Sequence, residues 1–120
     1  MASTTIRVGL LPSTRFMLGA AQVPKYSDKE NGIIATDRET GEKLYTVMLF
    51  LMEEDRAEAL KVTVPASGLP NGLKPGMPVK TVDLVARPWA NLFNGQVSSG
   101  VAYRVSALEL GLEPELDSGE

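Results

Sequence analysis

The sequence predicts an all-β fold: a small barrel of five strands followed by an acidic tail. Two β-rich runs flank a short charged loop in the middle of the chain, which is the pattern of a β-hairpin. The 11 glycines and 8 prolines among 120 residues favour short strands and turns over long helices. Closing the strands into a barrel would also remove the exposed edges that an open sheet leaves.

The central hairpin is predicted from Leu44–Met52 and Ala57–Val64. The second run alternates between apolar and polar residues, as a strand with one buried face does. The first run is apolar on both faces, so its second face, with Met48, Phe50 and Met52, must be covered by something. More protein, a second subunit or a flat ligand such as a nucleobase could cover it.

Three further strands complete the predicted barrel: Phe16–Val23, Val79–Arg87 and Val101–Leu108. Gly19 inside the first of them indicates a bend or bulge where that strand curls. The residues expected to face the core in the last two strands are Val82, Leu84, Ala86, Val101, Tyr103, Val105 and Ala107.

The connections between these strands are predicted from their composition. Residues 24–43 form a long polar connection, and long ordered loops are often functional. Residues 65–78 contain four prolines, which exclude a long helix there. Residues 91–99 are predicted to be a second polar loop that contains Asn94-Gly95.

Charge divides the chain unevenly. The net charge is −3, but the last basic residue is Arg104 and five of the 15 acids follow it, which leaves 12 bases against 10 acids in residues 1–104. Together with the strand pattern, this predicts an N-terminal arm over 1–13, a barrel domain over 14–110 and an acidic tail over 111–120. The tail either keeps the protein in solution or competes with polyanions and recruits partners.

The composition argues against an enzyme. The chain has no cysteine and no histidine, so disulfides, Fe–S clusters and imidazole catalysis are excluded. The acids at 53–55 lie in a predicted turn, and Ser98-Ser99 has no histidine for a triad. We expect no catalytic residues, no metal and no cofactor. Residues 1–13 lack the pattern of a signal peptide and no apolar run is long enough to span a membrane, so we expect a cytoplasmic protein.

A binding role has more support. Binding a nucleic acid single strand needs cations for the phosphates and aromatic planes for unstacked bases. Arg87 and Trp89 lie two apart on one predicted strand and so share a face, and Lys61 faces outward on the central hairpin. The predicted nucleic-acid-binding residues are Lys43, Tyr45, Phe50, Lys61, Arg87 and Trp89. The alternatives are that Trp89 packs at a barrel end, that Tyr45 is a core residue and that Phe50 is a dimer contact or part of a second small core.

From residue 16 to 108 the chain resembles the OB-fold family of small single-stranded DNA-binding proteins of actinobacterial plasmids and conjugative elements, and more distantly the gene V type proteins of filamentous phages. The segments that carry the resemblance are Asp37–Tyr45, Lys61–Pro65, Lys74–Val79 and Ala86–Trp89. The chain departs from OB folds that have a helix between the third and fourth strands, because a Pro/Gly-rich segment stands there.

The resemblance implies a non-enzymatic protein that binds single-stranded DNA as a homodimer, away from membranes, in the replication or transfer of a plasmid or phage-like element. The alternative is an oligomerising adaptor or regulatory protein that has the same barrel and no nucleic-acid role. Salt dependence separates the two, because phosphate contacts weaken steeply with ionic strength and an apolar protein interface does not.

Overall fold

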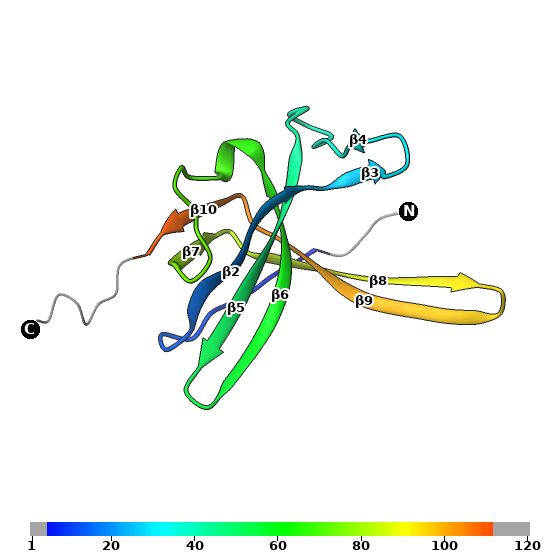
Figure 1. The fold of residues 1–120 in the computed structure, drawn as a ribbon. Helices are drawn as coiled ribbons and strands as arrows, with labels where there is room; N and C mark the ends of the chain where they lie inside the picture. The colour runs from blue at the N-terminus through cyan, green and yellow to red at the C-terminus, as the bar shows by residue number, and fades with distance from the viewer. Residues whose placement is uncertain (1–4, 112–120) are drawn as a thin grey trace, which may run out of the picture.

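The computed structural model describes residues 5–111, so all of the predicted acidic tail except Gly111 lies outside the described residues. Within that range the chain is built from strands and one short 3₁₀ turn (Figure 1). The elements are β1 (Ile6–Arg7), β2 (Arg15–Pro24), β3 (Tyr26–Asp28), β4 (Ile33–Ile34), β5 (Leu44–Glu53), β6 (Arg56–Pro65), η1 (Ala66–Gly68), β7 (Pro78–Val82), β8 (Val85–Phe93), β9 (Gln96–Arg104) and β10 (Ala107–Leu110).

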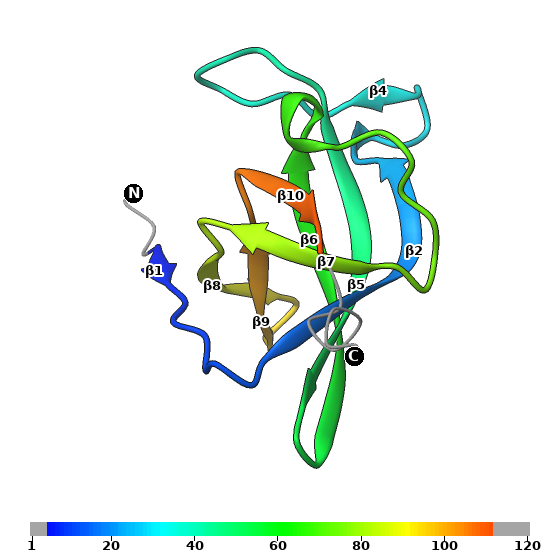
Figure 2. The same cartoon turned by 90° about the vertical axis from the view of Figure 1, so that its left-hand side faces the viewer.

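The all-β prediction is confirmed, but the sheet is not closed into a barrel of five strands. The described residues form an eight-stranded sheet in the order β1-β8-β9-β6-β5-β2-β7-β10, with β3 and β4 paired separately. Neighbours are antiparallel except β6 and β9, which run parallel at Val62 and Tyr103. Strands β7 and β8 are joined through Asp83 and Leu84 alone. Figure 2 shows the molecule from the side on which β7 and β10 lie.

The core forms where the central hairpin faces the rest of the sheet. The predicted alternation holds: Leu49 lies opposite Leu60, and Val47 lies opposite Val62. Apolar side chains that recur at every second residue of paired strands meet on one face, so burying one row buries the other. The fully buried side chains are Leu18, Val47, Leu49, Val62, Val64 and Val105.

Two predicted strands are broken, and each break changes which residues face the core. Asp83 has a positive φ of 55°, which separates β7 from β8 just before the buried Leu84. The last strand bends at Ser106, so Leu108 is buried where Ala107 was expected. The bend packs against η1, where a Cβ on Gly68 would stand 2.3 Å from the Ser106 carbonyl oxygen, so residue 68 has to be glycine.

The prediction of a polar loop over 91–99 is wrong, because β8 and β9 run through it as a hairpin (Figure 1). Asn94 and Gly95 form the turn with φ angles of 52° and 77°. Two consecutive positive φ angles define the tight turn that best matches the twist of paired strands. The outer part of this hairpin, residues 87–102, is called the arm below, since it extends away from the body of the sheet.

Gly19 is a bulge, as predicted. The pairing of β2 with β5 shifts register on both sides of the residue that follows it. A Cβ on Gly19 would come within 2.9 Å of Cε2 of Phe50, so the glycine makes room for that ring. The second face of β5 is thus partly covered by its own chain: Met48 and Met52 are half-buried, while Phe50 remains exposed.

Candidate nucleic-acid interface

An open cleft of about 680 Å³ lies between the connection that follows β2 and the base of the arm. The long polar connection forms one wall, and the outward sides of β6, β8 and β9 form the other. The cleft is lined by Lys25, Thr36, Asp37, Arg38, Glu39, Leu44, Thr63, Val85, Arg87, Ala102, Tyr103 and Arg104.

Four cations line this cleft, and three of them, Lys25, Arg87 and Arg104, form a cluster in which the two arginines act on the lysine; the fourth is Arg38. The backbone of Lys25 is fixed because its N–H donates to the Leu44 carbonyl at 3.0 Å. Its Nζ donates to Oγ1 of Thr63 at 3.0 Å. Partial burial, and then the positive charges of Arg104 and Arg87, lower the pKa of Lys25 from its ordinary value. Like charges held this close in a cleft favour binding of an anion, which would relieve their mutual repulsion.

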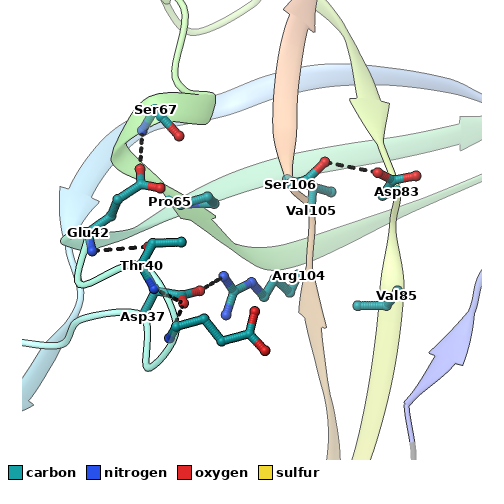
Figure 3. Close-up of a pocket in the computed structure, with 11 residues that line it drawn as sticks. Asp37, Thr40, Glu42, Pro65, Ser67, Asp83, Val85, Arg104, Val105 and Ser106 are labelled. Atoms are coloured by element: carbon teal, nitrogen blue, oxygen red, sulfur yellow. Dashed lines mark hydrogen bonds and ion pairs between the residues drawn. The ribbon is translucent and has the colours of Figure 1, made fainter.

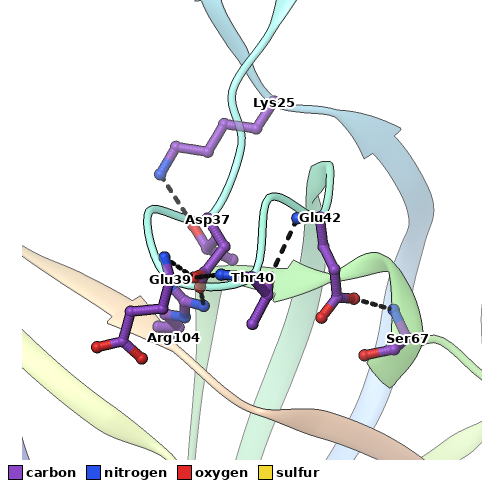
Figure 4. Close-up of polar contacts among 8 residues, drawn as sticks. Lys25, Asp37, Glu39, Thr40, Glu42, Ser67 and Arg104 are labelled. Carbon is purple, nitrogen blue, oxygen red and sulfur yellow. Dashed lines mark hydrogen bonds and ion pairs between the residues drawn. The ribbon is translucent and has the colours of Figure 1, made fainter.

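Besides Glu39, one further acid lines the cleft, Asp37. Its carboxylate forms an ion pair with Arg104 and accepts hydrogen bonds from the N–H groups of Glu39 and Thr40 (Figure 4). The Arg104 hydrogen bond, followed by these backbone donors, lowers the pKa of Asp37 to about 2. Asp37 therefore stays ionised at neutral pH, and it ties the 37–42 loop to β9.

The same loop is held at its other end by Glu42. Its Oε1 accepts a hydrogen bond from the Ser67 N–H at 2.8 Å. The side chain of Ser67, and then this N–H, lower the pKa of the Glu42 carboxyl. A smaller pocket of about 360 Å³ opens between these contacts and β8 (Figure 3). Asp37, Glu39, Glu42 and Asp83 line it, so its charge does not suit an anion. Over residues 5–111 no group of three or more acidic side chains is arranged to hold a metal ion.

The arm carries aromatic side chains outward from the cleft. Cross-strand pairs place Arg87 beside Ala102, Trp89 beside Gly100 and Phe93 beside Gln96 on one face. This outer arm face comprises Arg87, Trp89, Asn91, Phe93, Gln96, Ser98, Gly100 and Ala102. Trp89 is 43% exposed and Phe93 is 75% exposed. Because Arg87 also lines the cleft, the aromatic face and the cation cluster form one continuous surface.

The six residues predicted from sequence are only partly brought together. Arg87 lines the cleft, and Trp89 shares its face of β8. Lys61 lies two residues from the cleft residue Thr63 on the same side of β6, and Phe50 is exposed on the outward side of β5. Two predicted residues lie elsewhere. Tyr45 is half-buried opposite the core residue Val64, and Lys43 is exposed but is not among the residues that line the cleft.

Sequence reasoning missed two cations of the cluster. The residues around Arg104 in its strand give no sign that it would meet Lys25, which lies 79 residues earlier. The parallel pairing of Thr63 with Arg104 brings them together, because Lys25 hydrogen-bonds to that same threonine. Parallel pairings between distant segments leave no local pattern in a sequence.

Among residues 5–111, no helix is long and apolar enough to cross a membrane. Comparison of the chain with family models, with curated proteins and with solved structures found no match.

Proposed function

We propose that this protein is a non-enzymatic single-stranded DNA-binding protein that acts in the cytoplasm in replication or transfer of a plasmid or phage-like element. The observation that carries the proposal is the junction of the Lys25, Arg87 and Arg104 cluster with the exposed rings of Trp89 and Phe93. Phosphates follow the cations, and unstacked bases lie against the rings.

The sheet topology supports the same proposal. OB folds are partly open Greek-key barrels that bind oligonucleotides on the face of their second and third strands and on the loops at its ends. Here β5 and β6 correspond to those two strands, and the cleft lies between the connection before β5 and the base of the β8–β9 hairpin. The parallel pairing of β6 with β9 and the pairing of β2 with both β5 and β7 agree with that arrangement.

The surface suits a single strand better than a duplex. Stacking on Trp89 and Phe93 needs bases whose faces are free, and a duplex hides them. The cluster and Lys61 place four cations along the proposed path, and Arg38 also lines the cleft. Phosphate affinity scales with the number of such contacts, so one copy binds weakly, with a slope of log affinity against log salt of about −3.

The test is a titration of labelled oligo-dT at several salt concentrations, with the fluorescence of Trp89 followed in parallel because it is the chain's only tryptophan. We expect a steep loss of affinity with salt and a change in Trp89 emission on binding. Trp89→Ala should weaken binding by about tenfold or more, since stacking of one base contributes roughly 1–3 kcal/mol. Trp89→Phe, which keeps an aromatic plane, is the matched control and should retain most of the affinity.

The adaptor reading remains the second candidate, because much of the arm is apolar and exposed. It predicts no binding of oligo-dT even at low salt. That result, with a protein shown to be folded by circular dichroism, would overturn the single-stranded DNA proposal.

A further inference from the structure

The arm has a second face that the proposed nucleic-acid interface does not use. Cross-strand pairs place Pro88 with Val101, Ala90 with Ser99 and Leu92 with Val97. These six residues are called the inner arm face, since successive residues of a strand point to opposite sides of the sheet.

The inner arm face lies on the core side of the sheet, but most of it is not covered by other residues of the described chain. At the body, Leu84 and Val105 are buried on this side of the sheet. Farther out, Leu92 and Val97 are each 72% exposed. The apolar row therefore runs from the core to the tip, as it would in a strand buried along its whole length, while the described chain covers only its base.

We propose that a second copy of this chain covers the inner arm face, so that two arms pack face to face about a two-fold axis. The three cross-strand rows fit that arrangement. The middle row, Ala90 with Ser99, is small and allows close approach at the axis. The row at the tip then packs on the row at the base of the partner arm, which is the self-complementary contact that a two-fold interface requires.

Charge selects a second copy over a nucleic acid strand as the occupant. From Pro88 to Tyr103 the sequence has no charged residue. A phosphate backbone would find no cation on this face, whereas two acidic chains can meet there without like-charge repulsion. An arm with a bare apolar face is also a poor structure alone, since a two-stranded hairpin is marginal in water.

The size of the face sets the expected strength. Burying a side chain of the size of leucine, valine or proline removes roughly 100 Å² of apolar surface. Pro88, Leu92, Val97 and Val101 would then bury about 400 Å² in each copy, before the backbone and the small middle row are added. That total lies at the low end of specific interfaces, so we expect a dimer with a dissociation constant on the order of micromolar.

The arrangement leaves the outer arm faces, with Trp89, on opposite sides of the dimer. If the proposed function holds, the dimer presents two weak sites to one DNA strand and gains affinity by linking them. Dimerisation itself does not depend on that function, and the sedimentation and disulfide experiments that test it contain no DNA.

The test is sedimentation velocity over concentrations from low to several hundred micromolar. We expect a concentration-dependent dimer in the wild type, and a monomer for Leu92→Asp and Val97→Asp. Asn91→Asp and Ser98→Asp add the same charge to the neighbouring positions of the outer arm face and should leave the dimer intact. All four positions are exposed, so a thermal melt should show each variant folded.

A disulfide trap gives an independent readout, because the chain has no cysteine. Ala90→Cys should form a disulfide-linked dimer on mild oxidation, and Asn91→Cys should not. A wild type that is monomeric at every concentration would overturn the proposal. A dimer that survives Leu92→Asp would also overturn it, and would point to the side of β5 that carries the exposed Phe50. So would a Leu92→Asp variant that has the same oligomeric state as the wild type but has lost oligo-dT binding, because the inner arm face would then bind the nucleic acid.

Discussion

The indole ring of Trp89 lies over the backbone of Gly100, its cross-strand partner in the arm. A Cβ at residue 100 would stand 2.8 Å from Cζ2 and 3.0 Å from Cε2 of that ring. Because residue 100 has no side chain, the indole packs directly against the backbone there, while the ring remains partly exposed for a ligand. Covering a glycine with an aromatic cross-strand neighbour also steadies the pairing of the two strands.

Gly100→Val should displace the indole ring of Trp89 from the backbone of residue 100. Because the branched side chain would occupy the space of the indole, we expect oligo-dT affinity to fall several-fold and the Trp89 emission to shift toward that of a fully exposed indole. Fluorescence titration of the free and bound protein measures both. Ser98→Val, which adds similar bulk on the same face one cross-strand pair farther out, is the control and should leave the emission of free Trp89 unchanged.

Arg87→Ala should flatten the salt dependence of binding. Removing one phosphate contact lowers the slope of log affinity against log salt by roughly 0.7–1 for a single strand. Lys80→Ala removes an equal charge from β7, outside the cleft, and should leave the slope as in the wild type. Equal slopes for both variants would show that Arg87 contacts no phosphate.

Lys25 should make binding sensitive to alkaline pH. The pKa of Lys25 is lowered from 10.5 by burial and by Arg104 and Arg87, so its charge is lost at a lower pH than that of an ordinary lysine. Affinity for oligo-dT should decline as pH rises through that lowered pKa. Lys25→Arg keeps its charge over this range and should bind with a flatter profile between neutral pH and pH 10. Identical profiles would exclude a phosphate contact at Lys25.

The ion pair of Asp37 with Arg104 should hold the 37–42 loop on β9 well into the acidic range. The pKa of Asp37 is lowered from 3.8 to about 2, so the stability that its carboxylate provides is fully present above pH 3.8 and is lost as pH falls through about 2. Carboxyl resonances followed by NMR should show Asp37 titrating in that window. Arg104→Gln removes the first cause of the shift, and the midpoint should move up toward the ordinary value. An unchanged midpoint would mean that the backbone donors alone hold the carboxylate.

The β8–β9 hairpin has a clear turn signal in the sequence, although its strands are hard to recognise there. Asn94-Gly95 is the strongest short signal of a hairpin, but the polar side chains of Asn91, Gln96 and Ser98 on either side of it favour a loop. Those side chains are the outer arm face, and the apolar residues between them are the inner one. Polar and apolar residues do alternate in the arm, but its many polar residues make the segment resemble a loop.

Local sequence patterns predict the central hairpin, the bulge at Gly19 and the strand face that Arg87 and Trp89 share. Each follows from the alternation of side chains or from glycine geometry within a few residues. Two features depend on how distant segments pack: Lys25 meets Arg104, and Tyr45 takes the core position rather than a binding one. The meeting depends on a parallel pairing between β6 and β9 and on a loop fixed by Asp37. Such contacts join segments far apart in the chain, and their energy depends on where the whole sheet folds rather than on any neighbouring residue.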